Sequence, residues 1–356
     1  MKKKYFGTTK DNEQASRYIL KNKQGMEIAI SDFGALLLAI RMKDKNAEIQ
    51  DVILGYDSME EYYNNDCGFG AYIGRNGNRI QGASVVLDGV EYLLEKNDNG
   101  NNLHSGRKRS HYQFYKATVG ESEEGEYVQL ERVSPHLEQG FPGNLKQVIR
   151  YTLSEDNRLI IDYEMESDMT TVVNPTNHTY FNLAGHKSGD VLAQKLEIYS
   201  DAFLPTDDEL IPTGEVATVE GTPMDFRQAK AVGQDIHAEY EPLQIAGGYD
   251  HNYVFENNGK MKQMAKIYCP LTGIYMKVYS DLCGMQIYSG NFLDGVRGKE
   301  DAVYAKNAGI CFETQYYPNA CKEPRFPSSI LKAGKKFTSR TIYEFGLEGM
   351  ETENME

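Results

Sequence analysis

Hydrophobic and polar residues alternate with a period of two along much of the chain, and no comparably long segment has the period of a helix. The alternation over 85–94 flanks Asp88-Gly89, a dipeptide typical of a tight β-hairpin turn. The segments 145–153 and 158–166 flank the polar turn SEDN, and 264–270 and 273–280 meet at LTG. Each of these pairs predicts two antiparallel strands.

The composition supports the same fold class, since tyrosine (25 residues), phenylalanine (14) and glycine (33) are abundant. Short helices are expected at 58–64 and 226–238. Many strands without βαβ alternation and without an internal repeat favour an all-β fold, a large antiparallel β-sandwich, over an α/β fold or a propeller. We expect a single domain over residues 1–345, followed by an acidic C-terminal tail over 346–356 that frays.

The charge of the chain limits the classes of partner that it is expected to bind. With 52 acidic and 38 basic residues the formal charge is −14, so nucleic acid binding is not expected. The basic start of the chain is followed by polar residues rather than an apolar signal region, and no apolar run approaches a membrane span. We therefore expect a cytoplasmic protein with no membrane partner. The five cysteines are widely spaced without a CxxC pair, which argues against disulfides and a zinc site and predicts mostly buried thiols.

The segment 173–183, VNPTNHTYFNL, places His178 among amides, hydroxyls and aromatic rings. Pro175 fixes its φ and lacks an N–H, so the segment is expected to leave or border a sheet and turn His178 toward a cleft. The asparagines at 174, 177 and 182 offer donors and acceptors that suit sugar hydroxyls. For a single histidine, burial in the core with its partners satisfied is the alternative.

Other polar residues occur in segments that could approach a ligand. The glycine-rich segment 68–80 lacks the order of a phosphate loop, so its glycines favour close approach of backbone to a ligand, with Arg and Asn as donors. An arginine salt-bridged at a sheet edge is the alternative there. His104 precedes a Ser-Gly turn, and Asp250 follows Gly-Gly-Tyr, where an Asx-turn is the alternative. Gln286 faces away from its two neighbours, toward solvent or a cleft.

Glu313 is the strongest single candidate for a catalytic residue. In the segment 309–318, GICFETQYYP, alternation puts Ile310 and Phe312 on one face of a strand and Cys311 and Glu313 on the other. Apolar and aromatic surroundings disfavour a charged carboxylate, so the pKa of Glu313 is expected to rise toward the range of a general base. An exposed glutamate on an edge strand is the alternative.

Eight ordered blocks of this sequence resemble the aldose 1-epimerase (galactose mutarotase) family, and the resemblance covers most of the chain. The blocks are 68–80, 101–106, 140–145, 173–185, 201–216, 247–254, 285–295 and 313–331. The resemblance implies a large single-domain β-sandwich, the galactose mutarotase-like supersandwich, with an open sugar cleft across one sheet.

The resemblance also implies an activity and its residues. Glu313 would be the general base and His178 the general acid of an aldose 1-epimerase, an isomerase that interconverts the α and β anomers of free hexoses such as galactose and glucose. The pKa of an unperturbed histidine, about 6.5, suits this acid role near neutral pH. No metal or other cofactor is required, the partner is a small-molecule aldose, and a monomer is expected. The residues implied to bind substrate are Asn78, Arg79, His104, Tyr180, Asp250 and Gln286.

Departures from the family pattern bear on the rim of the site and leave the preferred aldose open. Ser105 stands where a second glycine is usual, Pro175 stands where leucine is common, and the chain has no tryptophan. A sugar-phosphate epimerase of related fold is one alternative, in which 107–109 (RKR) would form a cationic pocket rather than a solvated turn. A non-catalytic carbohydrate-binding module is another. A glycosidase that uses Asp250 and Glu313 is a third.

Overall fold

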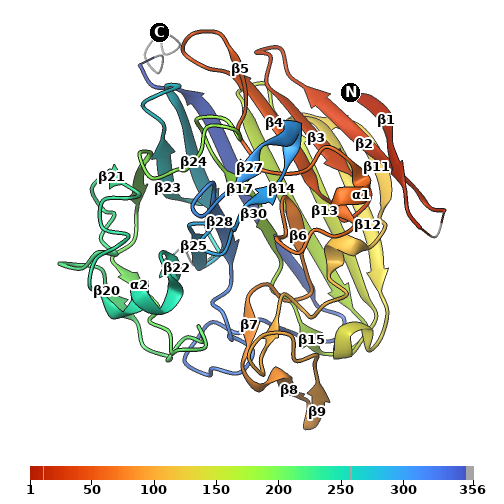
Figure 1. The fold of residues 1–356 in the computed structure, drawn as a ribbon. Helices are drawn as coiled ribbons and strands as arrows, with labels where there is room; N and C mark the ends of the chain where they lie inside the picture. The colour runs from red at the N-terminus through yellow and green to blue at the C-terminus, as the bar shows by residue number, and fades with distance from the viewer. Residues whose placement is uncertain (11, 257–258, 350–356) are drawn as a thin grey trace.

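The structure is a computed structural model, and it describes residues 1–10, 12–256 and 259–349. Antiparallel strands dominate this part of the chain and form large sheets that pack face to face (Figure 1). The all-β, antiparallel sandwich expected from the sequence is therefore confirmed.

The nine-stranded sheet is the largest layer, and its long strands β12, β13, β14 and β30 lie side by side in Figure 1. In spatial order its strands are β11 (Lys116–Ser122), β12 (Gly125–Ser134), β13 (Leu145–Leu153), β14 (Arg158–Ser167), β30 (Lys336–Leu347), β24 (Ile274–Ser280), β23 (Lys262–Tyr268), β18 (Lys195–Ile198) and β21 (Lys230–Ala231). The last strand, β30, alternates buried and less buried residues, as expected for a sheet with one covered face.

Two further sheets lie against this layer. The six-stranded sheet has the order β17 (Tyr180–Phe181), β28 (Ile310–Gln315), β25 (Gly284–Tyr288), β22 (Asp250–Val254), β19 (Ala202–Phe203) and β20 (Ala217–Thr218). The five-stranded sheet has the order β1 (Lys2–Thr8), β2 (Gln14–Lys21), β3 (Glu27–Ser31), β4 (Leu37–Lys43) and β5 (Ile49–Asp51).

Short strand pairs and short helices complete the described elements. The pairs are β6 (Ala71–Ile73) with β16 (Thr176–His178), β7 (Arg79–Ile80) with β10 (Asn102–Leu103), β8 (Ser84–Leu87) with β9 (Val90–Leu93), β15 (Thr171–Val172) with β29 (Ile330–Leu331), and β26 (Val296–Arg297) with β27 (Val303–Tyr304). The helices are α1 (Met59–Tyr62), α2 (Glu241–Ala246), and the 3₁₀ turns η1 (Gln81–Ala83), η2 (Ser110–Tyr112), η3 (Glu138–Gly140) and η4 (Lys299–Asp301).

A buried apolar cluster joins the six-stranded and nine-stranded sheets. Phe181 of β17 packs on Tyr343 and Phe345 of β30, with ring centroids 5.0 and 6.4 Å away. The hydroxyl of Tyr343 donates a hydrogen bond of 2.9 Å to the carbonyl of Phe312 in β28. These contacts hold the inner face of β28 against the core, and every residue of β28 is buried. Its opposite face is therefore rigidly placed for chemistry.

Arg75 in the glycine-rich segment 68–80 is a structural residue. It is buried and donates hydrogen bonds to the carbonyls of Ser134, Pro135, Pro142 and Gly143. Burial lowers the pKa of Arg75 to about 10. This arginine neither faces a ligand nor forms a salt bridge at a sheet edge; it ties β-strand ends together.

The predicted strand pairs are confirmed, but one predicted helix is wrong. Asp88 and Gly89 join β8 and β9 with positive φ at both positions, as a type I′ turn requires. Within 226–238 the described backbone forms turns and the short strand β21, which pairs with β18. The second helix, α2, begins later, with proline in its first turn, and ends at Gly247 in the left-handed region.

The cysteines and the chain end also differ in detail from expectation. All five cysteines are free thiols; Cys269 and Cys311 are buried, and the other three are half-buried, so the prediction that most are buried was wrong. Strand β30 extends to Leu347, inside the segment expected to be a tail, and residues 350–356 lie outside the described residues.

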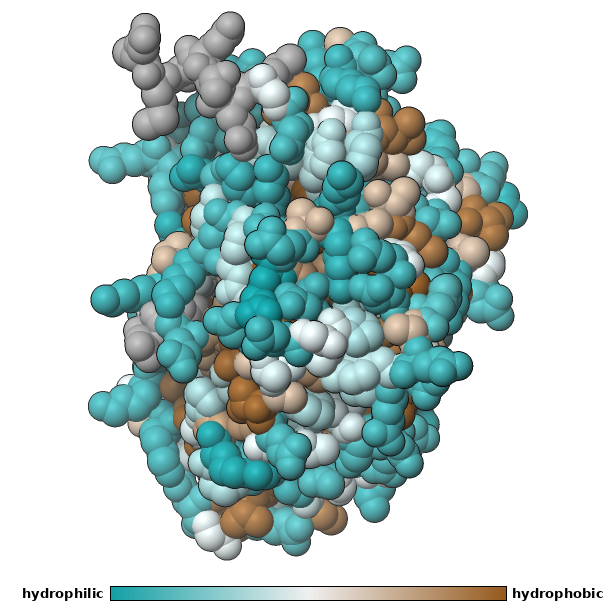
Figure 2. Space-filling view, turned by 90° about the vertical axis from the view of Figure 1, so that its left-hand side faces the viewer, coloured by the Kyte–Doolittle hydropathy of each residue, from teal (hydrophilic) through white to brown (hydrophobic). Residues whose placement is uncertain are grey.

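The surface is largely polar on the face drawn in Figure 2, where hydrophilic residues cover most of the coloured area and hydrophobic residues occur in small groups. In the described ranges, no helix is both long enough and apolar enough to cross a membrane.

Candidate active site

A cavity of about 270 Å³ opens beside the outer face of β28. Its wall combines strand residues from β7, β16, β17, β22 and β28 with loop residues near η2 and after β25. Seven of the eight site residues predicted from the sequence line it: Asn78, Arg79, His104, His178, Tyr180, Asp250 and Glu313.

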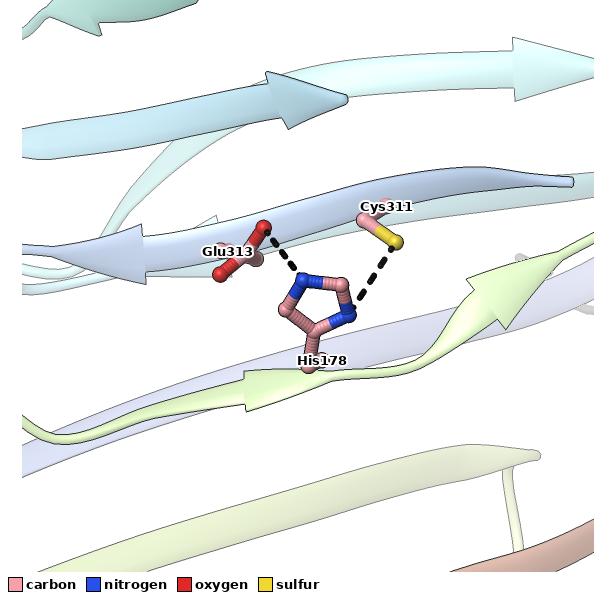
Figure 3. A group of neighbouring side chains, drawn as sticks. All are labelled: His178, Cys311 and Glu313. Carbon is pink, nitrogen blue, oxygen red and sulfur yellow. Dashed lines mark hydrogen bonds and ion pairs between the residues drawn. The ribbon is translucent and has the colours of Figure 1, made fainter. Parts of the chain in front are cut away.

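His178 and Glu313 face each other in this cavity. Nε2 of His178 lies 3.6 Å from Oε1 of Glu313, and both side chains are buried (Figure 3). His178 closes β16 just after Pro175, which separates β15 from β16 as the sequence predicts. The other carboxylate oxygen of Glu313, Oε2, is buried and has no hydrogen-bond partner among the described residues. That oxygen can accept a proton from a ligand.

The surroundings of His178 and Glu313 disfavour the charged forms of both side chains. Burial raises the pKa of Glu313 well above its ordinary value, the charge of Asp250 adds to this, and Arg79 acts in the opposite sense. The raised pKa predicted for Glu313 is therefore confirmed. Burial also lowers the pKa of His178 to about 4, with the charge of Arg109 as the second cause, so this imidazole is uncharged at neutral pH and does not keep the ordinary pKa expected from the sequence.

Cys311 lies on the other side of the imidazole ring. Its Sγ is 3.8 Å from Nδ1 of His178, so the ring stands between a thiol and a carboxylate (Figure 3). His178, Cys311 and Glu313 are residue types that can bind a metal ion. One possible ligand atom from each of them lies within 4.8 Å of the other two. Because Nδ1 faces the thiol and Nε2 faces the carboxylate, neither nitrogen faces both partners. The arrangement suits an oriented proton carrier better than a metal centre.

His104 is held as a neutral hydrogen-bond donor. The backbone N–H of Asn78 donates to its Nδ1 at 3.1 Å, which leaves the ring proton on Nε2. Burial, followed by the charges of His178 and Arg109, lowers the pKa of His104 well below its ordinary value. The rings of His104 and His178 meet nearly at right angles, with centroids 5.3 Å apart.

A carboxylate holds the side chain of Arg79 in place. Its Nε donates to Oδ2 of Asp98 at 2.7 Å, and its backbone N–H donates to Oδ1 of Asn78. The side chain is mostly buried, so its guanidinium is held in one orientation along the cavity wall. Such a planar group can donate several fixed hydrogen bonds.

Gln286 stands apart from the cavity lining and supports Asp250. Its Nε2 donates to Oδ1 of Asp250 at 2.7 Å, and in the sheet Gln286 is the register partner of Glu313. Burial raises the pKa of Asp250, and Arg79 opposes this shift. Tyr180 lines the cavity, but its hydroxyl donates to the carbonyl of Cys67. Its ring, rather than its hydroxyl, is therefore available to contact a ligand.

Two interpretations from the sequence are wrong in detail. Asn174, Asn177 and Asn182 lie outside the cavity lining and bond to the protein itself: Asn174 to the backbone of Tyr316, Asn177 to a tyrosine hydroxyl, and Asn182 to carbonyls. Ser105 does not shape the rim either. It is fully buried, and its hydroxyl bonds to the backbone of a neighbouring loop.

Arg109 and Phe292 also line the cavity; the sequence suggested Arg109 only as part of the run 107–109, a cationic pocket or a solvated turn, and did not suggest Phe292. Arg109 lines the wall, although the run 107–109 carries no sequence signal that separates this arginine from its exposed neighbours. Phe292 is 66% exposed at the rim and stacks on Tyr288, with centroids 6.1 Å apart and ring planes at 27°. Aromatic rings of this kind can cover the apolar face of a sugar.

The architecture is an antiparallel β-sandwich with a polar cavity built on one strand face, the class of fold seen in sugar epimerases of the galactose mutarotase type. Residues 16–344 match the family model described as aldose 1-epimerase, and the chain belongs to the aldose 1-epimerase family.

Named relatives agree with this assignment. The chain is 38% identical over 323 residues to galactose mutarotase of Bos taurus, covering 90% of this chain and 92% of that protein. It is 33% identical over 329 residues to aldose 1-epimerase of Escherichia coli strain K12, covering 92% and 94%. The crystal structure of galactose 1-epimerase from Lactobacillus acidophilus NCFM superposes with a TM-score of 0.85 at 25% identity, covering 97% of this chain and 99% of that one.

Proposed function

We propose that this protein is an aldose 1-epimerase, an isomerase that interconverts the α and β anomers of free hexoses such as galactose and glucose. The observation that carries the proposal is the contact between His178 and Glu313, 3.6 Å apart in a cavity with fixed hydrogen-bond donors around it. Anomer exchange needs one group that takes a proton from the C1 hydroxyl and one that gives a proton to the ring oxygen, the two oxygens bonded to C1.

In the proposed mechanism, the carboxylate of Glu313 takes the proton of the C1 hydroxyl while the imidazolium of His178 protonates the ring oxygen. The bond between C1 and the ring oxygen breaks, and an open-chain aldehyde results. Rotation about the C1–C2 bond presents the other carbonyl face. The C5 hydroxyl then attacks C1 and returns its proton to His178, and Glu313 returns a proton to the new C1 hydroxyl. All protons balance within the pair.

The resting pair contains the proton that this mechanism uses. A carboxylic acid beside a neutral imidazole and a carboxylate beside an imidazolium have the same total charge and the same number of protons. Burial favours the first form. A bound sugar donates its C1 hydroxyl to Glu313 and offers its ring oxygen to His178, which stabilises the second form. The two groups therefore titrate as a unit.

The remaining residues have supporting roles in this proposal. Arg79 and His104 donate hydrogen bonds to sugar oxygens, Asn78 holds both of them in place, and Asp250 accepts from hydroxyls. Gln286 orients Asp250, and Tyr180 forms a wall. No cofactor takes part in any step. We also propose a single domain, a monomer, and a cytoplasmic location, which rest on the sequence pattern.

Polarimetry tests the proposal. Freshly dissolved α-D-galactose and α-D-glucose should reach their equilibrium rotations faster with catalytic amounts of the protein than without it. Incubation with methyl and p-nitrophenyl galactosides tests the glycosidase alternative, and no reducing sugar or nitrophenol should be released. Binding of galactose without faster mutarotation would instead identify a carbohydrate-binding module and overturn the proposal.

A further inference from the structure

Arg109 places a positive charge on the wall of the cavity without a carboxylate to neutralise it. It precedes η2, and its Nη1 donates a hydrogen bond of 2.9 Å to the backbone carbonyl of Asp66. Within the described ranges, no carboxylate lies within ion-pair distance of its guanidinium. The remaining N–H groups of this guanidinium can therefore bind a ligand.

Other arginines with limited solvent access have their charge or their donors satisfied by the protein. Arg79 is paired with Asp98, Arg132 with Glu138, and Arg75 with backbone carbonyls. Arg107, the exposed neighbour of Arg109, lies near Glu95. Arg109 thus differs from these arginines in having a cavity on one side and a single carbonyl on the other.

The acidic residue bonded to Arg109 through its backbone leaves the cation available. Asp66 also lines the cavity, but its carboxylate accepts a hydrogen bond from the hydroxyl of Tyr112 at 3.4 Å, and the contact to Arg109 is made by its carbonyl. Lys108, next to Arg109, is exposed and adds positive charge on the outside.

The covalent structure of a hexopyranose indicates which part of a substrate lies near Arg109. In a hexopyranose the ring oxygen is bonded to C5, and C5 carries C6. If His178 serves the ring oxygen and Glu313 the C1 hydroxyl, C6 projects from the His178 end of the ring. Arg109 lies at that same end, because it is bonded to the carbonyl of Asp66, and Gly68, two residues further along this loop, lies against the ring of His178, where an added Cβ would be 3.6 Å from Cγ and Nδ1.

We propose that Arg109 binds an anionic group on C6 of an aldose, a carboxylate or a phosphate, so that hexuronic acids or hexose 6-phosphates are substrates alongside neutral hexoses. This inference rests on the proposed function, because it uses the same acid–base pair. A guanidinium suits both anions, since its planar N–H groups can donate two parallel hydrogen bonds to oxygens of either.

The first test compares sugars that share one ring and differ at C6: D-galactose, D-galacturonate, D-galactose 6-phosphate and the 6-deoxy sugar D-fucose. Exchange of anomeric signals in proton NMR at equilibrium gives each rate without a pure anomer, after subtraction of the uncatalysed rate. We expect catalysed exchange of galactose and of at least one anionic sugar. Carboxylate turnover alone, or phosphate turnover alone, supports the inference and identifies which anion is used.

The second test uses Arg109→Gln with Lys108→Gln as its matched control, because both remove one charge from the same loop and Lys108 lies outside the cavity lining. Arg109→Gln should lower the ratio of kcat/KM for the anionic sugar to kcat/KM for galactose by about 10- to 100-fold, the strength of a charge-assisted pair. Lys108→Gln should change this ratio by less than about twofold, as expected of a screened surface charge.

Binding can be measured apart from chemistry. Methyl α-D-galactosiduronate and methyl α-D-galactoside cannot open, so each acts as a competitive inhibitor of galactose mutarotation. Arg109→Gln should weaken inhibition by the first more than inhibition by the second.

The outcomes separate the two proposals. Turnover of galactose with neither anionic sugar turned over, or equal ratios in Arg109→Gln and Lys108→Gln, would overturn the role of Arg109. No turnover of galactose itself would overturn the proposed function instead.

Discussion

Nε2 of His178 and Oε1 of Glu313 lie 3.6 Å apart, close enough for both groups to contact the same sugar ring. The two residues come from different strands, β16 and β28, and each strand is fixed by the sandwich beneath it. A sugar can therefore contact both side chains through its C1 hydroxyl and its ring oxygen, which are bonded to the same carbon. This geometry demands little motion of the protein during the reaction.

Replacement of His178 tests the acid. His178→Asn keeps a polar side chain but cannot carry a proton to the ring oxygen, so kcat for galactose should fall by about 10² to 10⁴. Polarimetry of the purified, folded variant gives the value. His237→Asn is the matched control, since His237 is exposed and should leave the rate unchanged. A near-normal kcat in His178→Asn would remove His178 from this role.

Replacement of Arg79 tests substrate positioning. Arg79→Lys keeps the charge but loses the planar group that Asp98 holds in place, so we expect a raised KM with a smaller change in kcat. Initial rates over a range of galactose concentrations separate the two constants. Arg297→Lys, at an exposed arginine, is the control. Unchanged kinetics in Arg79→Lys would show that the guanidinium does not contact the sugar.

Burial of Glu313 predicts a pH-dependent stability. Because its folded-state pKa is raised, the protonated carboxyl contributes stability that is fully present below the unfolded-state pKa and is lost as pH rises through the folded-state pKa. Glu313→Gln stays neutral throughout. The variant should therefore unfold at a higher temperature than the wild type at alkaline pH. This difference in unfolding temperature should shrink as pH falls below the ordinary pKa of glutamate.

Thermal unfolding followed by circular dichroism at a series of pH values measures this difference. The shift of His178 acts in the opposite direction, since its lowered pKa gives stability that is lost as pH falls toward about 4, but it is shared by both proteins. A difference in unfolding temperature that is constant with pH would contradict the buried, raised-pKa carboxyl.

The shared proton predicts a change in His178 when a sugar binds. Nitrogen-15 NMR of labelled histidine should show a neutral imidazole in the free protein at neutral pH, because burial lowers the pKa of His178. Saturation with D-galactose, which the enzyme keeps at its anomeric equilibrium, should shift this signal toward the imidazolium value, because the C1 hydroxyl donates to Glu313 and the ring oxygen accepts from His178. An unchanged, neutral signal would instead favour the reverse roles, with Glu313 as the acid and His178 as the base.

Local patterns in the sequence predicted the strands well, because alternation and turn chemistry act over a few residues. The Asp88-Gly89 hairpin and the opposite faces of Ile310 and Glu313 in β28 followed directly from them. The helix expected over 226–238 failed because pairing of β21 with β18 outweighs a weak local helix preference.

The positions of side chains in the cavity were predictable where a resemblance to a family supplied the residues, and otherwise they were not. The asparagines of 173–183 have the right chemistry for a sugar, but the fold turns them toward other groups of the protein: backbone groups for Asn174 and Asn182, and a tyrosine hydroxyl for Asn177. Arg109 has two cationic neighbours in the chain, and the fold brings it alone of the three to the cavity, within the described residues. Such selection depends on tertiary contacts that no local pattern records.

The central claim is that Glu313 exchanges a proton with the C1 hydroxyl, and the mutarotation rate of Glu313→Gln tests it most directly. Polarimetry of fresh α-D-galactose should give a kcat lower than wild type by about 10² to 10⁴, with a folded protein and little change in the affinity for methyl α-D-galactoside. A rate for Glu313→Gln within a small factor of the wild type would contradict the account.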